Sequence, residues 1–194
     1  MNIITVFCAS SPGYNPAYVE AAQQTGQFLA ERDITLVYGG GRVGLMGALA
    51  DAVLAGGGRV VGVIPQFLLD WEVGHQGLTE LIVVESMHER KLKMADLCEG
   101  FMALPGGFGT LEELVEILTW SQLDLHRKPI GILNTAGYYD PLLQFFNHMV
   151  QEGLLKEANR NLAIFDNDLN QLFEKMTSFE PSITTKWVGD SHKT

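Results

Sequence analysis

Cysteine is scarce in this sequence, and its histidines do not form a metal-binding pattern. The two cysteines, Cys8 and Cys98, have no other cysteine or histidine near them at the spacing of metal ligands. The five histidines form neither an HxxxH nor an HExxH arrangement. These absences argue against a disulfide framework and a structural zinc site, so we predict two small, reduced core residues and no metal.

Basic residues and long apolar runs are also lacking. Lys and Arg together number 13 against 23 Asp and Glu, which gives a formal net charge of −10. Nonspecific nucleic-acid binding relies on clustered Lys and Arg that neutralise phosphates, so we expect no nucleic-acid partner. The sequence opens without a basic segment, and no apolar run approaches the roughly 18 residues that a membrane span requires. We therefore expect a cytoplasmic protein that makes no membrane contact.

The remaining pattern is one of apolar runs that alternate with amphipathic stretches. Such alternation predicts an α/β fold, a Rossmann-like parallel sheet with helices on both faces. No Ser- or Pro-rich linker divides the chain, so we predict a single domain over residues 1–177 and a partly mobile C-terminal tail over residues 178–194. The predicted strands are residues 3–8, 34–38, 59–64, 81–84, 101–104 and 130–133, with a short edge strand at 162–165. The predicted helices are one that Asn15 caps and Pro16 begins, and then residues 45–55, 87–98, 111–123, 139–152 and 169–176.

Three predicted strands end in turns rich in glycine or serine, at residues 9–13, 39–44 and 105–110. The carboxyl ends of parallel strands lie at one edge of the sheet, where ligands bind if the strand order reverses. Glycines let backbone amides approach a phosphate closely, and serine or threonine hydroxyls add hydrogen bonds. The sequence therefore predicts an anion site at this edge.

The turn at residues 39–44 matches the GxGxxG fingerprint of dinucleotide-binding proteins, and it lies between a strand and a helix. That interpretation requires an acidic residue at the end of the next strand, where this sequence has Val63, Ile64, Pro65 and Gln66. We therefore favour contact with a phosphate or a ribose. The alternative is that the glycines only permit a tight turn and close helix packing.

The turn at residues 105–110 follows a buried strand and leads into a helix that carries Glu113. At such a turn the first N–H groups of the helix have no partner within it, and the helix dipole favours an anion there. A carboxylate near a bound nucleotide suggests catalysis. Thr110 and Glu113 also fit a capping box, in which Glu113 would only stabilise the helix start.

The helix at residues 87–98 places Arg90 and Lys91 on one face together with two methionines. A guanidinium in an apolar stripe is costly unless it is paired or held for a ligand, so Arg90 is either a structural ion-pair partner or a site residue. Glu89 and Lys93 are four residues apart and predict a solvated pair. His126 and Lys128 lie on a turn, as surface or site residues.

Residues 105–113, with Met87, His88, Glu89, Arg90 and Lys91 upstream, resemble the LONELY GUY family of cytokinin riboside 5′-monophosphate phosphoribohydrolases. The resemblance covers nearly the whole chain. Such proteins have often been labelled lysine decarboxylases, but nothing in this sequence marks a Schiff-base lysine or a pyridoxal phosphate site. Further likeness lies in residues 8–11, 38–41, 44–47, 62–65, 119–120, 126, 128–129 and 137–139.

The resemblance implies hydrolysis of the N-glycosidic bond of a purine nucleoside 5′-monophosphate, which releases the base and ribose 5-phosphate. It also implies a homodimer, a purine nucleotide as the small-molecule partner, and no metal or organic cofactor. Arg90 and Glu113 match the catalytic pair. Asp124 departs from the family, which commonly has glycine there, and we expect it to add negative charge near the site entrance. The expected substrate-binding residues are Ser10, Gly39, Gly40, Gly41, Met87, Lys91, Pro105, Gly106, Gly107, Gly109 and Thr110.

The rival interpretation is a nucleotide-binding or carrier protein that holds its ligand without cleaving it. A glycine-rich turn binds phosphate equally well in either kind of protein. The carboxylate of Glu113 is what favours the enzyme, because a glycosidic bond breaks through a positively charged sugar that an anion stabilises.

Overall fold

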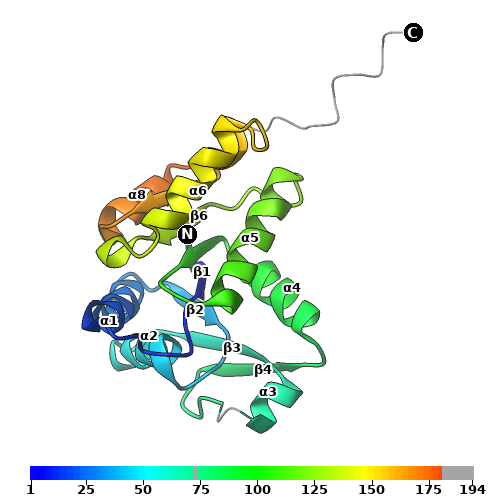
Figure 1. Ribbon diagram of the computed structural model, residues 1–194. Helices are drawn as coiled ribbons and strands as arrows, with labels where there is room; N and C mark the ends of the chain where they lie inside the picture. The colour runs from blue at the N-terminus through cyan, green and yellow to red at the C-terminus, as the bar shows by residue number, and fades with distance from the viewer. Residues whose placement is uncertain (72–73, 181–194) are drawn as a thin grey trace.

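Apolar runs form the strands of one sheet, and the amphipathic stretches between them form helices (Figure 1). The computed structural model describes residues 1–71 and 74–180. The strands are β1 (Ile3–Phe7), β2 (Thr35–Tyr38), β3 (Val60–Pro65), β4 (Glu80–Val84), β5 (Gly100–Ala103), β6 (Ile130–Leu133) and β7 (Ala163–Asp166). The helices are α1 (Pro16–Glu31), α2 (Gly44–Ala55), α3 (Gln66–Trp71), α4 (Met87–Leu97), α5 (Phe108–Gln122), α6 (Asp140–Gln151), α7 (Glu157–Arg160) and α8 (Leu169–Thr177), with a 3₁₀ turn η1 (Thr135–Gly137).

The sheet has the strand order β4-β3-β2-β1-β5-β6-β7, and every neighbouring pair is parallel. The chain builds outward from β1 to β4, then crosses back to place β5 on the other side of β1. The order therefore reverses between β1 and β5, which is where ligands bind in open sheets of this kind. The predicted parallel sheet is confirmed, and the turns after β1, β2 and β5 lie at one edge as expected.

Two apolar cores cover the two faces of the sheet. On one face α1, α2 and α8 bury side chains such as Leu29, Leu49 and Leu172 against the strands. On the other face α4, α5 and α6 bury Met94, Leu114 and other apolar residues. Figure 1 shows α1 and α2 on one side of the strands and α4 and α5 on the other. Because both faces are covered, the edge of the sheet is left as the place for a site.

Local capping sets where several helices begin. The side chain of Asn15 accepts a hydrogen bond from the N–H of Ala17 at 3.0 Å, and Pro16 occupies the first turn of α1, as predicted. At α4 the hydroxyl of Ser86 accepts from the N–H of Glu89, whose carboxylate accepts in turn from the N–H of Glu85 at 2.9 Å. Glu89 therefore stabilises the helix start, and the predicted pair with Lys93 does not form among the described residues.

The helix α5 begins at Phe108, three residues before the predicted start. Its N-cap is Gly107, so Thr110 is already the third helical residue and cannot act as a cap. The capping-box interpretation of Thr110 and Glu113 is therefore wrong. The segment 107–110 carries too little apolar periodicity for the sequence to have marked it as helical.

The short and terminal segments agree with the prediction only in part. The helices α3 and α7, with 6 and 4 residues, went unpredicted because they are too short to show a helical period. The predicted edge strand at residues 162–165 is confirmed as β7. Of the predicted mobile tail, residues 181–194 lie outside the described residues. Within the described part of the chain, no helix is both long enough and apolar enough to cross a membrane.

Asp124 ends α5 in a left-handed conformation, with φ of 60°. Its N–H donates to the carbonyl of Ser121, and the N–H of Leu125 donates to the carbonyl of Trp120. This is a Schellman motif, in which glycine is the usual residue at the left-handed position. Asp124 pairs with Arg127 at 2.9 Å. It lies at the end of α5 opposite the glycine-rich turn, so the expectation that it stands near the site entrance is wrong.

The backbone conformation of Asp124 predicts the effect of two substitutions on stability. Both Asp124→Gly and Asp124→Ala remove the pair with Arg127, but only glycine adopts a positive φ without steric cost. We expect the glycine variant to unfold about 2–4 °C above the alanine variant, measured by differential scanning calorimetry. Equal melting temperatures would show that the left-handed turn relaxes in the alanine variant.

Candidate active site

A cleft of about 470 Å³ opens at the carboxyl ends of β1 and β5, where the strand order reverses. This volume lies within the usual range of small-molecule sites. Gly40, Gly41 and Lys91, which the resemblance placed among the binding residues, lie outside the lining. The expected site residues that line the cleft are Ser10, Gly39, Met87, Arg90, Pro105, Gly106, Gly107, Gly109, Thr110 and Glu113.

The N-terminus of α5 forms one wall of the cleft. Its first helical hydrogen bond runs from the N–H of Leu111 to the carbonyl of Gly107, at 3.0 Å. The N–H groups before Leu111 therefore have no partner in the α-helical pattern, and the positive end of the helix dipole lies with them. The side chain of Thr110 is buried against Gly106, where a Cβ would overlap it. An anion is the ligand that these donors suit.

The glycine-rich turn after β2 is used differently. The N–H groups of Leu45 and Met46, at the start of α2, both donate to the carbonyl of Ala9, at 3.1 and 3.3 Å. The carbonyl of Gly40 accepts from the N–H of His75, and Gly41 forms a bridge with Gly74. The chain itself thus occupies two N–H groups at the start of α2 that could otherwise bind a phosphate, while Gly39 still lines the cleft.

Arg90 is held at the cleft by backbone carbonyls. Its Nε donates to the carbonyl of Val63 at 3.1 Å, and Nη2 donates to the carbonyl of Gly39 at 2.9 Å. A Cβ on Gly39 would overlap the guanidinium, which is why that position has no side chain. The Arg90 side chain is buried, and among the described residues it forms no ion pair. Its charge is therefore not neutralised, and its remaining N–H donors are available to a ligand.

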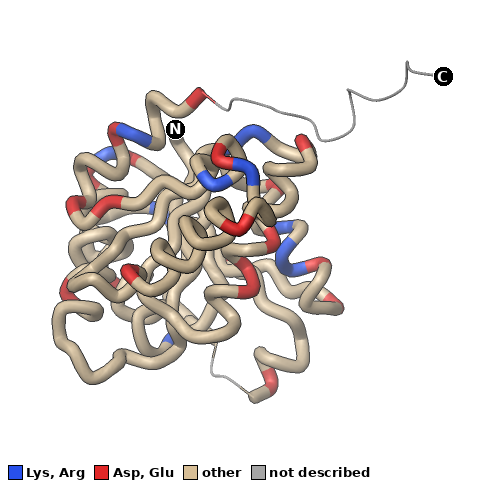
Figure 2. The backbone as a smooth tube through the Cα atoms, turned by 45° about the horizontal axis from the view of Figure 1, so that its top comes forward, with Lys and Arg blue, Asp and Glu red and all other residues tan. Residues whose placement is uncertain are grey.

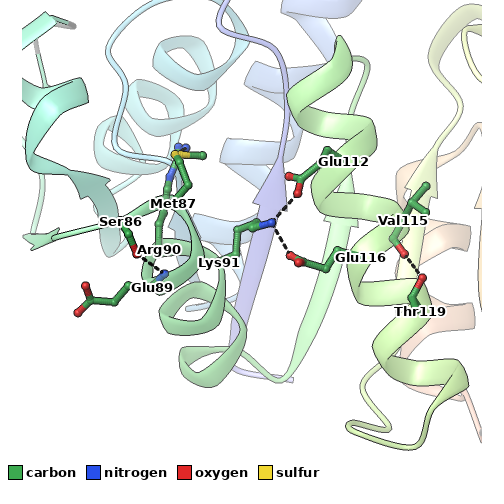
Figure 3. Close-up of polar contacts among 9 residues, drawn as sticks. All are labelled: Ser86, Met87, Glu89, Arg90, Lys91, Glu112, Val115, Glu116 and Thr119. Atoms are coloured by element: carbon green, nitrogen blue, oxygen red, sulfur yellow. Dashed lines mark hydrogen bonds and ion pairs between the residues drawn. The ribbon is translucent and has the colours of Figure 1, made fainter.

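Lys91, the next residue, points to a different place. Its Nζ lies 2.5 Å from Glu112 and 2.9 Å from Glu116, and Figure 3 shows it reaching from α4 to these two carboxylates on α5. The two hydrogen bonds favour the ammonium form and raise the pKa of Lys91 against the opposing effect of burial. The structural ion pair between neighbouring helices that the sequence allowed for Arg90 is thus made by Lys91.

Glu113 lines the cleft and is partly buried. No hydrogen bond or ion pair to its carboxylate is formed by the described part of the chain. Burial raises its pKa to about 7, because a carboxylate loses hydration there; the positive charge of Arg90 opposes this shift, and Glu112 adds to it. A carboxyl group that titrates near neutrality inside a cleft is typical of an active site.

Sequence reasoning missed two tyrosines that follow β6. Tyr138 lines the cleft, and its hydroxyl donates to the carbonyl of Gly106 at 2.7 Å. The hydroxyl of Tyr139 donates to the carbonyl of Leu104 at 2.7 Å. The only signal for them was their place in the family resemblance. The other lining residues that were not named as site residues are Val6, Phe7, Cys8, Ala9, Ser11, Pro12, Gly13, Tyr18, Leu45, Met46, Leu68, Met94, Phe108 and Glu112.

Other titratable groups have structural roles. The ring of His126 forms a hydrogen bond with the carbonyl of Ile117, and Lys128 donates to the carbonyl of Ala95. Neither residue lines the cleft. Burial raises the pKa of the Cys8 thiol, which stays protonated at neutral pH. The described residues contain no group of His, Cys, Asp or Glu that could hold a metal ion. Lys and Arg are interspersed with Asp and Glu along the chain (Figure 2).

Solved structures with the same fold include two proteins that bind the molybdenum cofactor. The molybdenum cofactor binding protein from Rippkaea orientalis has a TM-score of 0.69 and 21% identity, covering 91% of this chain and 95% of that one. The Moco carrier protein from Chlamydomonas reinhardtii has a TM-score of 0.66 and 20% identity, covering 89% and 98%. At these identities the likeness establishes the fold alone.

Sequence comparison identifies the family. A family model described as "Possible lysine decarboxylase" matches residues 46–176. The cytokinin riboside 5′-monophosphate phosphoribohydrolase LOG7 of Arabidopsis thaliana is 47% identical over 190 residues, which covers 96% of this chain and 88% of that protein. The enzyme named LOG from Oryza sativa subsp. japonica is 45% identical over 187 residues, covering 96% and 77%. With these matches over nearly its whole length, the chain belongs to the LONELY GUY family, whose named members are phosphoribohydrolases.

Proposed function

We propose that this protein hydrolyses the N-glycosidic bond of purine nucleoside 5′-monophosphates, cytokinin ribosides or adenosine, to the free base and ribose 5-phosphate. One observation carries the proposal: the unpaired N-terminus of α5 and the partly buried Glu113 carboxyl face the same cleft. The relatives named phosphoribohydrolases support it over a carrier role.

The phosphate would bind at the start of α5. Gly106, Gly107 and Gly109 keep side chains out of the way, so the ligand can approach the backbone N–H groups closely. Thr110 and Ser10 bring hydroxyl groups to the same cleft. Binding energy from this remote group would help to orient the sugar at the reacting carbon.

The ribose would then lie near Glu113. Glu113 follows Gly109 by four residues, so the two lie on the same face of α5, about 6 Å apart along its axis. That spacing suits a 5′-phosphate at the helix start and a sugar one helical turn further on. The carboxylate of Glu113 stabilises the positive charge that builds on the sugar as the bond to the base breaks.

Arg90 would act on the departing base. As that bond breaks, its electron pair stays with the base, while water adds its oxygen to the sugar carbon and its proton ends on the base. A guanidinium is a poor acid, so Arg90 serves as a fixed cation that stabilises the negative charge on the base. The carbonyls of Val63 and Gly39 hold it in place without neutralising it.

A homodimer is part of the proposal. The helices α4 and α5 expose apolar side chains, with Leu92 and Val115 54% and 45% exposed, and a second copy could cover them. Multi-angle light scattering should give about twice the chain mass at assay concentrations, and a monomer mass would contradict the dimer.

We also propose that the protein is located in the cytoplasm. Both cysteines are free, which fits the reducing conditions there.

Incubation with substrate tests the activity directly. The purified protein should release free base and ribose 5-phosphate from AMP or from isopentenyladenosine 5′-monophosphate, as measured by liquid chromatography. Comparison of the two rates shows which base is preferred. Nucleotide that stays bound and intact for hours would support the carrier interpretation instead.

Glu113→Gln should separate catalysis from structure. We expect turnover to fall at least ~100-fold. The free energy of unfolding of the variant should not be lower than that of the wild type above pH 7. At such pH the wild-type Glu113 is ionised, and burial of its charge costs stability, which the neutral glutamine avoids. If the ionised form is active, kcat/KM of the wild type should rise with pH through about 7, and the variant should lose this rise.

Glu116→Gln is the matched control for this experiment. Glu116 lies on the same helix and pairs with Lys91, but it does not line the cleft. Its substitution should leave turnover nearly unchanged and keep the rise of kcat/KM with pH, with a midpoint slightly lower at most, because the charge of Glu116 makes only the smallest contribution to the raised pKa of Glu113. If Glu113→Gln kept full turnover, the carboxylate would have no catalytic role.

A further inference from the structure

The carbonyl groups of Leu104, Pro105 and Gly106, in the turn after β5, each accept a hydrogen bond from another part of the chain. Tyr139 donates its hydroxyl to the carbonyl of Leu104, and the N–H of Ala9 donates to the carbonyl of Pro105 at 3.2 Å. Tyr138 donates its hydroxyl to the carbonyl of Gly106 at 2.7 Å. These contacts fix how each peptide group of the turn is rotated.

Rotation of a peptide group determines where its N–H points. In a planar trans peptide the carbonyl and the following N–H point in opposite directions. The carbonyl of Gly106 belongs to the same peptide group as the N–H of Gly107, which lies in the cleft wall. The carbonyl of Leu104 belongs to the same group as the nitrogen of Pro105, which has no hydrogen. The two tyrosines therefore make equal hydrogen bonds with unequal consequences.

The hydrogen bond from Tyr138 acts on the peptide group before Gly107, whereas the carbonyl of Gly107 itself accepts from the N–H of Leu111. Nothing lies within 4 Å of the position that a Cβ on Gly107 would take, so no neighbouring group packs against this side of the turn. The ring of Tyr138 is itself held, because it packs edge-on against Tyr18 and Tyr139 with centroids 5.4 and 5.0 Å away. These ring contacts fix the position of the Tyr138 hydroxyl, and the hydroxyl in turn orients the glycine-rich turn through its hydrogen bond.

We propose that Tyr138 is a positioning residue for recognition of the 5′-phosphate. By holding the carbonyl of Gly106, it aims the N–H of Gly107 into the cleft, toward the phosphate of the nucleotide. The inference rests on the proposed function for the identity of the ligand. It adds that discrimination between a nucleotide and a nucleoside depends on a hydroxyl group that follows β6.

Tyr138→Phe keeps the ring and removes only this hydroxyl. Isothermal titration calorimetry should show the affinity for ribose 5-phosphate falling roughly tenfold, the effect of one impaired hydrogen bond to an anion. The affinity for adenosine, which lacks the phosphate, should stay within twofold of the wild type. In turnover of AMP the loss should appear in KM more than in kcat.

Tyr139→Phe is the matched control. It removes a hydroxyl from the neighbouring, almost fully buried tyrosine and leaves the carbonyl of Leu104 unpaired. The variant should melt at a lower temperature than the wild type. Its ratio of ribose 5-phosphate to adenosine affinity should equal that of the wild type, because no N–H in the cleft depends on that peptide group.

A second measurement follows the glycine itself. In protein labelled with ¹⁵N-glycine, the amide signal of Gly107 should shift on addition of ribose 5-phosphate, and this shift should shrink in Tyr138→Phe. The inference is overturned if Tyr138→Phe binds ribose 5-phosphate with wild-type affinity, or if its affinity for adenosine falls by the same factor. It is also overturned if Tyr139→Phe changes the ratio of the two affinities as much as Tyr138→Phe does. A wild-type protein that binds ribose 5-phosphate but cleaves neither AMP nor isopentenyladenosine 5′-monophosphate defeats the proposed function alone. A wild type that does not bind ribose 5-phosphate overturns both.

Discussion

A buried guanidinium that has no carboxylate partner among the described residues is the constraint on which the cleft depends. Arg90 is held by carbonyls of β3 and of the turn after β2, and such hydrogen bonds fix its position without cancelling its charge. The charge therefore acts on the cleft, where it opposes the effect of burial on the pKa of Glu113. It also explains Gly39, since any side chain there would occupy the place of the guanidinium. The ion pairs between α4 and α5 are made by Lys91 with Glu112 and Glu116, whereas Arg90 lines the cleft.

The two glycine-rich turns are similar in sequence but differ in which of their backbone groups are left to bind a ligand. At the start of α2 the carbonyl of Ala9 takes the free N–H groups, so that turn closes on the loop after β1. At the start of α5 the carbonyls of the turn are engaged and the N–H groups are left. Polar groups of a buried turn must find partners, and which of them is left over decides whether the turn can bind an anion.

Periodicity predicted the strands and long helices because each buries one face against the sheet, and a parallel sheet then brings the turns after β1, β2 and β5 to one edge. The turn that contains Ser10 and the turn that leads to Glu113 could therefore be placed together from the sequence pattern. Arg90 was assigned to the same site by the family resemblance, and all three residues line the cleft. The start of α5 was predicted wrongly because glycine carries no apolar signal. The direction of Lys91 and the contacts of Tyr138 could not be predicted, since each depends on how separate elements pack.

The strand order also determines when the cleft can exist during synthesis of the chain. Its walls come from the loop after β1, from α4, from the start of α5 and from Tyr138, which follows β6. A nascent chain that ends before Tyr138 leaves the carbonyls of Leu104 and Gly106 without their tyrosine partners. Contacts between such distant segments close large loops and form slowly. The ligand-binding geometry is thus acquired only after most of the protein has emerged from the ribosome.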